Sequence, residues 1–173
     1  SGAKGAFHDL HMADDVAVLR SGEALCRDTP RPLIVTAKTS DRLTAVLAAA
    51  RAKGKRIIAM ISDQASPVRD AFVGLDDRAA GQTAAFLIGR MLGDRPTTVG
   101  VVLGSPAFRN HEDREIGFRS GLRANFPKVV ISGEAQGEDS ADLTRNAVNR
   151  LLRDQPALGA IYNVGGGNMG LVE

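Results

Sequence analysis

The stretch Thr97 to Phe126, TTVGVVLGSPAFRNHEDREIGFRSGLRANF, carries the pattern that decides the fold. A continuous apolar run over 97–104 predicts a buried strand. After a short loop, residues 108–126 are predicted as a helix, and Pro127 marks its exit. An apolar strand followed by a helix is the repeating unit of a parallel sheet that helices cover on both faces.

The same unit repeats along most of the chain. Apolar runs predict further strands at 32–37, 56–61, 71–75, 128–133 and 157–164, with a weaker one at 5–10. Helical patterns follow at 13–25, 42–54, 78–92 and 140–154. The candidate helix caps are Ser40 or Asp41, and Asp76 or Asp77. The sequence therefore predicts an α/β fold, with a polar, proline-bearing stretch at 93–98 as the candidate boundary between two halves.

Bulk properties exclude several functions. The 22 basic and 20 acidic residues give a net charge of +2, which is too balanced to favour a nucleic acid or a membrane surface as partner. No apolar run approaches the roughly 20 residues of a membrane span. The N-terminus lacks the apolar stretch of a secretory signal, although a processed signal would leave no trace. The single cysteine, Cys26, is expected to be a buried or inert thiol.

Three glycines near the end, Gly165, Gly167 and Gly170, have the G-x-G-x-x-G spacing of a dinucleotide-binding loop. That loop requires an acidic residue about 20 positions further on, whereas this sequence ends at Glu173. The pattern also follows the last strand rather than the first. We therefore expect no NAD site and no other cofactor. Asn163, at the end of the preceding strand, is either a small-molecule contact or a local cap of the turn.

In a parallel α/β sheet, ligands bind beyond the carboxyl ends of the strands, so the loops that follow strands hold the other candidates. Arg114 has a planar guanidinium suited to hydroxyls or a carboxylate, or else forms a surface salt bridge to Glu112 or Asp113. Ser62 and Asp63 follow a central strand, where they either contact a ligand or form an ordinary Asx-type turn.

Catalysis and metal binding have weaker signals. Ser105, His111 and Asp113 are the residue types of a hydrolase triad, but no G-x-S-x-G elbow surrounds the serine. The three histidines have no metal-ligand spacing. We therefore expect neither an enzyme nor a metal site.

The ordered motifs RIIAMISDQ, FVGLDDRAAGQTAAFLIGRML, VGVVLGS, REIGFRSGL and GAIYNVGGGNMG resemble the effector-binding domain of lactose-repressor-type (LacI/GalR) transcription regulators. The chain is similar also to periplasmic ribose-binding-like proteins, which share that fold. The resemblance implies two Rossmann-like lobes, each a parallel sheet flanked by helices, at 1–95 and 96–173. Both lobes are expected to be incomplete.

The resemblance also implies a site. Arg114 matches the arginine of R-x-x-G-F that binds effector hydroxyls, and Asn163 matches a strand-end asparagine, although the usual Asn-Asp is Asn-Val here. Phe108 and Asn110 fall where effector contacts occur. Met60 replaces a frequent aspartate, for which Ser62 or Asp63 is the expected substitute. The pair Asp76–Asp77 is expected to support the lobe rather than touch ligand.

The function implied is sensing of a sugar-like effector between the lobes, in the cytoplasm. Operator DNA would be bound by a helix-turn-helix domain that this chain lacks, and the full-length protein would be a homodimer. The alternative is a periplasmic sugar- or solute-binding protein, and an NAD-dependent enzyme ranks third.

Overall fold

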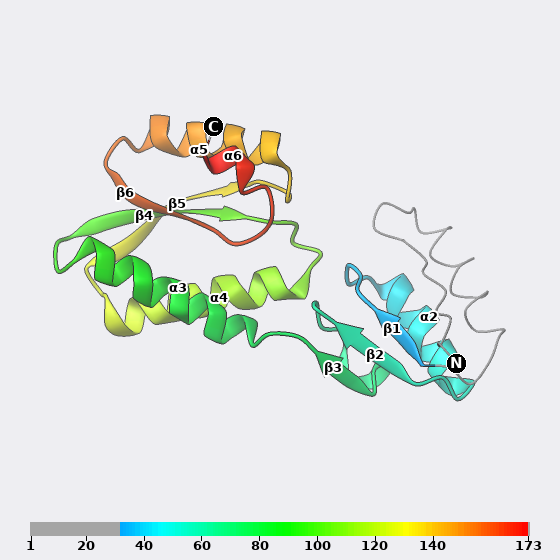
Figure 1. The fold of residues 1–173 in the computed structure, drawn as a ribbon. Helices are drawn as coiled ribbons and strands as arrows, with labels where there is room; N and C mark the ends of the chain where they lie inside the picture. Colours follow the sequence, from blue (N-terminus) through cyan, green and yellow to red (C-terminus); the bar gives the residue numbers. More distant parts are fainter. Residues whose placement is uncertain (1–31, 173) are drawn as a thin grey trace, which may run out of the picture. The chain divides into compact units, whose positions relative to one another are not determined.

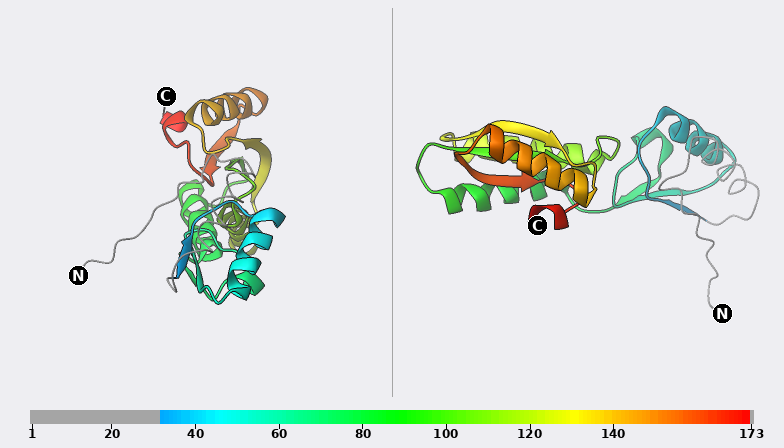
Figure 2. Two further views of the ribbon diagram at one scale, coloured as in Figure 1. Left: turned by 90° about the vertical axis from the view of Figure 1, so that its right-hand side faces the viewer. Right: turned by 90° about the horizontal axis from the view of Figure 1, so that it is seen from above.

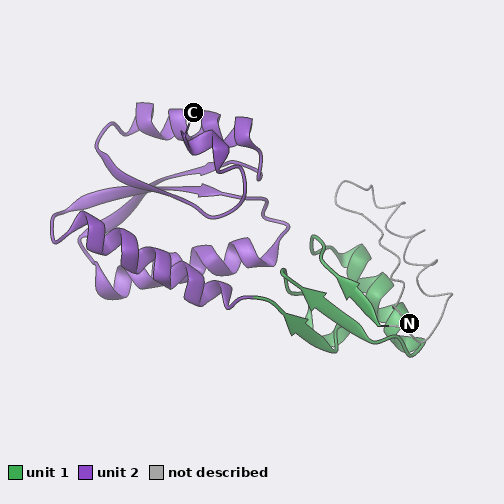
Figure 3. Cartoon of the chain, in the orientation of Figure 1, with its two compact units in different colours: residues 1–74 green, residues 75–173 purple. Residues whose placement is uncertain are grey.

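A computed structural model of the chain describes residues 32–172 (Figure 1). The strand predicted at 5–10, the helix predicted at 13–25 and Cys26 lie outside these residues. The chain divides into two compact units, residues 1–74 and 75–173 (Figure 3). Each unit is described by itself.

Unit 1 contains a parallel three-stranded sheet in the order β1-β2-β3. Its elements are β1 (Leu33–Val35), α2 (Asp41–Ala52), β2 (Ile57–Met60), the 3-10 helix η1 (Ser66–Val68) and β3 (Ala71–Val73). Ser40 is the cap of α2, since its side chain accepts a hydrogen bond from the Leu43 amide. Leu43 and Leu47 of α2 pack with Ile57 and Val68 to form the core of this unit.

Unit 2 contains a parallel sheet in the order β5-β4-β6. Its elements are α3 (Asp77–Leu92), β4 (Thr97–Leu103), α4 (Arg109–Asn125), β5 (Val129–Gln136), α5 (Ala141–Asp154), β6 (Leu158–Asn163) and α6 (Met169–Val172). Helices α3 and α4 lie on one face of the sheet, and α5 and α6 lie on the other (Figures 1 and 2). The prediction of parallel sheets flanked by helices is confirmed.

The central strand β4 explains why the stretch 97–126 decides the fold. Its side chains alternate between two cores, as the pleat requires. Val99 and Val101 pack with Phe118 of α4. Val102 packs on the opposite face with Leu151 of α5. Because both faces are covered, the strand is apolar without a break.

Helix α3 belongs to unit 2, which places the division after Gly74 and not at the predicted boundary of 95/96. The physical reason is a close contact between α3 and α4. A side chain at Gly81 would collide with the backbone of α4 at Arg114, and one at Gly117 would collide with the backbone of α3 at Arg78. Two helices approach this closely only where small residues face each other. Asp76 caps α3, accepting from the Ala79 amide at 2.9 Å.

Candidate functional site

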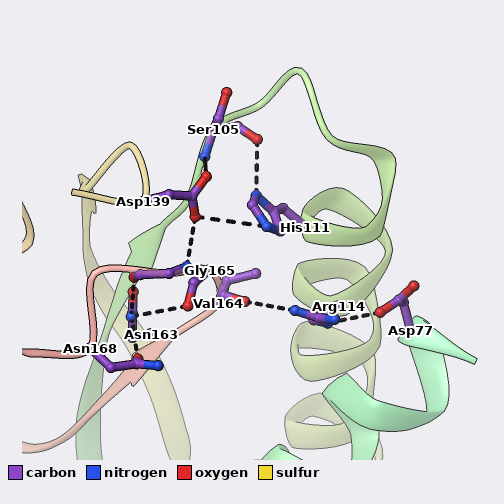
Figure 4. Close-up of polar contacts among 10 residues, drawn as sticks. Asp77, Ser105, His111, Arg114, Asp139, Asn163, Val164, Gly165 and Asn168 are labelled. Carbon is purple, nitrogen blue, oxygen red and sulfur yellow. Dashed lines mark hydrogen bonds and ion pairs between the residues drawn. The ribbon is translucent and has the colours of Figure 1, made fainter. Parts of the chain in front are cut away.

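The carboxyl ends of β4, β5 and β6 meet at one edge of the sheet of unit 2, because the strands are parallel. Three loops follow these ends, at 104–108, 137–140 and 164–168. This edge brings together four of the six predicted ligand residues: Phe108, Asn110, Arg114 and Asn163. Figure 4 shows the polar contacts there.

Arg114 joins three elements of unit 2. Its Nε donates to Asp77 Oδ1 at 2.8 Å, and its Nη1 donates to the Val164 carbonyl at 3.3 Å (Figure 4). The start of α3, the first turns of α4 and the end of β6 are thereby tied together. The predicted alternative, a salt bridge to Glu112 or Asp113, is wrong. Nη2 of Arg114 donates to none of the described residues, which leaves a donor for a ligand.

Asp77 is the support for this arginine. Its side chain is 7% exposed, against 25% for Arg114. Burial raises the pKa of the Asp77 carboxyl, and the Arg114 guanidinium opposes that rise. A buried carboxylate needs such a partner, because desolvation disfavours its charged form. The pair therefore fixes the guanidinium in one orientation.

Asn163 holds the glycine-rich loop. Its Nδ2 donates to the Gly166 carbonyl at 2.8 Å and to Asn168 Oδ1 at 2.8 Å, with a longer contact of 3.3 Å to the Gly165 carbonyl. These bonds fit the interpretation of a local cap of the turn. The Asn163 Oδ1 atom accepts from no residue within 32–172, so it remains available as an acceptor.

The glycine loop is packed against an internal carboxylate. Asp139 Oδ1 accepts from the Gly166 amide at 2.6 Å, and a side chain at Gly165 would collide with the same oxygen. An amide of the loop is therefore already bonded to the protein's own acid. The helix that follows, α6, has four residues. The G-x-G-x-x-G spacing thus has a packing explanation.

The residue types of a hydrolase triad are not assembled as one. His111 Nδ1 lies 3.0 Å from the backbone carbonyl of Ser105, and no bond between the ring and the serine hydroxyl is formed. Asp113 pairs with Arg78 at 2.8 Å and Arg109 at 3.5 Å. A serine nucleophile needs a base bonded to its hydroxyl.

Asn110 presents a buried oxygen without a donor. The residue is 7% exposed, and its Oδ1 has no hydrogen-bond partner. Phe108 precedes it at the start of α4, with its ring centroid 5.5 Å from that of His111. Buried polar atoms are nearly always bonded in native proteins, so Asn110 Oδ1 marks a place for a donor from a ligand or water.

Ser62 and Asp63 lie in unit 1, in the loop after β2. Asp63 accepts from the Gln64 amide at 2.8 Å and from Arg69 Nη2 at 2.7 Å. These contacts are local, but the bonded amide is that of the next residue and not the amide two residues on that defines an Asx-type turn. Ser62 is 1% exposed and its Oγ has no partner. Ile61, with φ of 67°, turns the chain sharply ahead of these residues.

Two residues of these loops were not predicted. Gln64 is fully buried, and its Nε2 donates to the Ala37 carbonyl at 2.9 Å. Asp139 lies at the centre of the unit 2 edge (Figure 4). The available signal for Asp139 was the acidic pair in the strand-end loop EAQGEDS, but nothing in the sequence distinguishes Asp139 from Glu138.

Two further observations concern membrane spans and metal sites in the described part of the chain. No helix within residues 32–172 combines the length and apolarity that crossing a bilayer requires. The same part of the chain contains no group of three His, Cys, Asp or Glu side chains placed to bind a metal ion.

Comparison with known proteins gives a consistent family. Residues 23–173 match the model of the periplasmic binding protein domain. An ABC transporter solute-binding protein from Burkholderia graminis, solved with D-arabinose, superposes with a TM-score of 0.81 at 21% identity, covering 91% of this chain and 53% of that one. A sugar-binding protein of a sugar ABC transporter from Bacillus halodurans gives 0.78 at 25% identity, with 91% and 54% covered.

An arabinose-binding protein from Geobacillus stearothermophilus gives a TM-score of 0.74 at 23% identity, with 91% of this chain and 54% of that chain covered. No curated protein sequence matches significantly. The chain spans about half the length of these solved structures. The matched model covers most of the chain and its fold is that of type I periplasmic binding proteins, so the chain belongs to the periplasmic binding protein domain family.

Proposed function

We propose that this chain is the sugar-binding part of a non-enzymatic solute receptor, of the kind that serves ABC transporters. The observation that carries the proposal is the unit 2 edge, which holds a guanidinium fixed by Asp77 and Val164 and two amide oxygens that accept no hydrogen bond from the described residues. Arg114 offers Nη2, and Asn110 and Asn163 offer their Oδ1 atoms. A sugar hydroxyl is both donor and acceptor, so it matches such a mixed set.

The structures named above support this reading, because they are a solute-binding protein solved with D-arabinose and two sugar-binding proteins. They favour the solute-binding alternative over the LacI-type regulator, which rests on the motif resemblance. A cytoplasmic location, operator DNA and a homodimer belong to the regulator candidate. The gene upstream of Ser1 distinguishes the two, since a regulator requires a helix-turn-helix there and a receptor requires a secretory signal.

The test is calorimetric titration of the full-length protein with D-arabinose, D-allose, fructose, glucose and galactose. We expect saturable binding of at least one sugar. Arg114→Ala should weaken that binding about tenfold to a hundredfold, because charge-assisted hydrogen bonds contribute roughly 1.5–3 kcal/mol each. Arg114→Lys should restore little, since a point charge does not reproduce the planar fork.

The matched control is Arg119→Ala. Arg119 lies on the same helix but pairs with Glu115 and Glu134, away from the strand-end loops. It should leave affinity unchanged. Wild-type protein that melts normally and binds none of the sugars contradicts the proposal, as does an Arg114→Ala variant with wild-type affinity.

A further inference from the structure

The Asp139 carboxylate joins the three loops that follow the carboxyl ends of β4, β5 and β6 in unit 2. Asp139 lies in the loop after β5. Its Oδ2 accepts from the Ser105 amide at 3.1 Å, after β4, and its Oδ1 accepts from the Gly166 amide at 2.6 Å, after β6 (Figure 4). One side chain therefore sets the relative positions of all three loops.

The backbone at this point is strained. Glu138 and Asp139 have φ angles of 50° and 62°, in the left-handed region that non-glycine residues rarely occupy. Two such residues in succession persist only where surrounding contacts hold them. Gly104 and Gly165 provide the space, since a side chain at either position would collide with Asp139 Oδ1. The loops are thus built around the carboxylate.

His111 adds a titratable partner. Its Nδ1 lies 3.0 Å from the Ser105 carbonyl, which is an acceptor only, so Nδ1 carries the hydrogen. The remaining nitrogen, Nε2, is the atom that gains a proton, and it lies 3.8 Å from Asp139 Oδ1. When neutral, Nε2 turns a lone pair toward the carboxylate. When protonated, it turns a positive charge and a hydrogen toward it.

Other charged groups near His111 are already paired. Asp77, at the start of α3, also interacts electrostatically with His111 but is bonded to Arg114 of α4. Asp113, on the histidine's own helix, pairs with Arg78 and Arg109. Asp139 differs, because no arginine or lysine within residues 32–172 pairs with it. It is the acid whose carboxylate lies beside His111 Nε2.

We propose that Asp139 and His111 form a pH-sensitive latch that orders the ligand-facing loops of unit 2 more tightly at acidic pH. Histidine is the side chain that ordinarily changes charge between pH 5 and 8. Acidification across that range adds attraction between the imidazolium and the carboxylate, and thereby holds the Ser105 and Gly166 amides in place. That these loops bind sugar rests on the proposed function, whereas the latch itself does not.

The direct test measures backbone amide exchange at Ser105 and Gly166 by NMR, corrected for the intrinsic pH dependence of exchange. A background of His8→Gln with His11→Gln leaves His111 as the single histidine. Between pH 7.5 and 5.5 we expect protection of both amides to rise about twofold to fivefold, the range for a partly exposed ion pair. His111→Gln, which keeps a donor for Ser105, should abolish that rise.

Asp139→Asn should speed exchange of both amides about tenfold or more at every pH, because a charged acceptor is lost from two hydrogen bonds. The control is Asp142→Asn, which removes an exposed acid three residues away that pairs with Arg145. It should leave both amides unchanged. If protection does not depend on pH, or is unaffected in Asp139→Asn, the latch is overturned.

Titration with the sugar that binds best separates the two proposals. With both correct, affinity rises on acidification in the wild type and is independent of pH in His111→Gln. If protection of the two amides depends on pH but the protein binds no sugar, the result supports the latch and contradicts the proposed function. If the protein binds sugar but protection of the two amides does not depend on pH, the result supports the proposed function and overturns the latch.

Discussion

The two units use polar strand-end residues in different ways. In unit 1, Asp63 is satisfied within its own loop, by the Gln64 amide and by Arg69 six residues later. In unit 2, Asp139 binds amides 34 residues before it and 27 residues after it. The first loop is a local turn that holds itself. The second set of loops is held by contacts between distant segments, so one substitution there affects three loops at once.

The largest expected effect is the loss of stability on truncating a core side chain, which tests whether the two units unfold independently. Phe118 is fully buried in unit 2 and Leu47 is 1% exposed in unit 1. We expect Phe118→Ala to destabilise unit 2 by about 3–5 kcal/mol and Leu47→Ala to destabilise unit 1 by about 2–5 kcal/mol. The protein has no tryptophan and a single tyrosine, Tyr162, which stacks on Phe118 at 4.3 Å. Tyrosine fluorescence during urea unfolding therefore reports on unit 2.

Independent unfolding is supported if Leu47→Ala leaves the urea midpoint of the tyrosine fluorescence transition at its wild-type value. A shift of that transition by the full amount would show that the units unfold together. Far-UV circular dichroism, which reports on both units, detects the Leu47→Ala change itself.

A smaller effect tests the assignment of α3 to unit 2. Gly81→Val places a side chain against the backbone of α4, at Arg114 and Phe118. Overpacking of this kind costs about 1–3 kcal/mol, and backbone atoms yield less than side chains. The tyrosine transition should move to lower urea. The control is Thr83→Val, on the same helix, where Thr83 is exposed. An unchanged transition in Gly81→Val would separate α3 from this unit.

The smallest effect concerns Asp70 in unit 1. Its carboxylate accepts from the Ile57 amide at 2.8 Å, and this bond, together with Arg51 and Arg56, lowers the pKa of Asp70. A lowered pKa in the folded state gives stability that is present above the unfolded pKa, near 4, and is lost as pH falls through the folded value. Asp70→Asn should therefore weaken unit 1 at pH 7 and change little at pH 2.

The measurement is exchange of the Ile57 amide at the two pH values, corrected for the intrinsic rate. Asp63→Asn serves as the comparison within unit 1, since Asp63 bonds a different amide. Equal protection of Ile57 in wild type and Asp70→Asn at pH 7 would contradict the role of the carboxylate.

Local pattern was enough to predict most elements. The helix caps show the precision of this prediction. For each of two helices the sequence offered two adjacent cap residues, and in the structure the first of each pair, Ser40 and Asp76, is the cap. Strand β5 runs to Gln136, beyond the predicted 133, despite polar residues. Its register with β4 shifts at Val99/Gly100, which leaves Ser132 as an extra residue. A bulge of this kind depends on the neighbouring strand and has no signature in the strand itself.

The sequence by itself determined the strand–helix repeat, the parallel sheets and the edge of the sheet where the candidate site lies, since apolar runs and caps are properties of short segments. It also placed Arg114 and Asn163 at that edge. Only the tertiary structure decided the partners of the arginine, Asp77 and Val164, whereas the asparagine bonds the adjacent glycine loop, as the predicted local cap of the turn would. The tertiary structure likewise decided that Asp139 fills the glycine loop and that α3 packs on α4. Such contacts join segments tens of residues apart, and their geometry exists only once the helices of unit 2 have packed on its sheet.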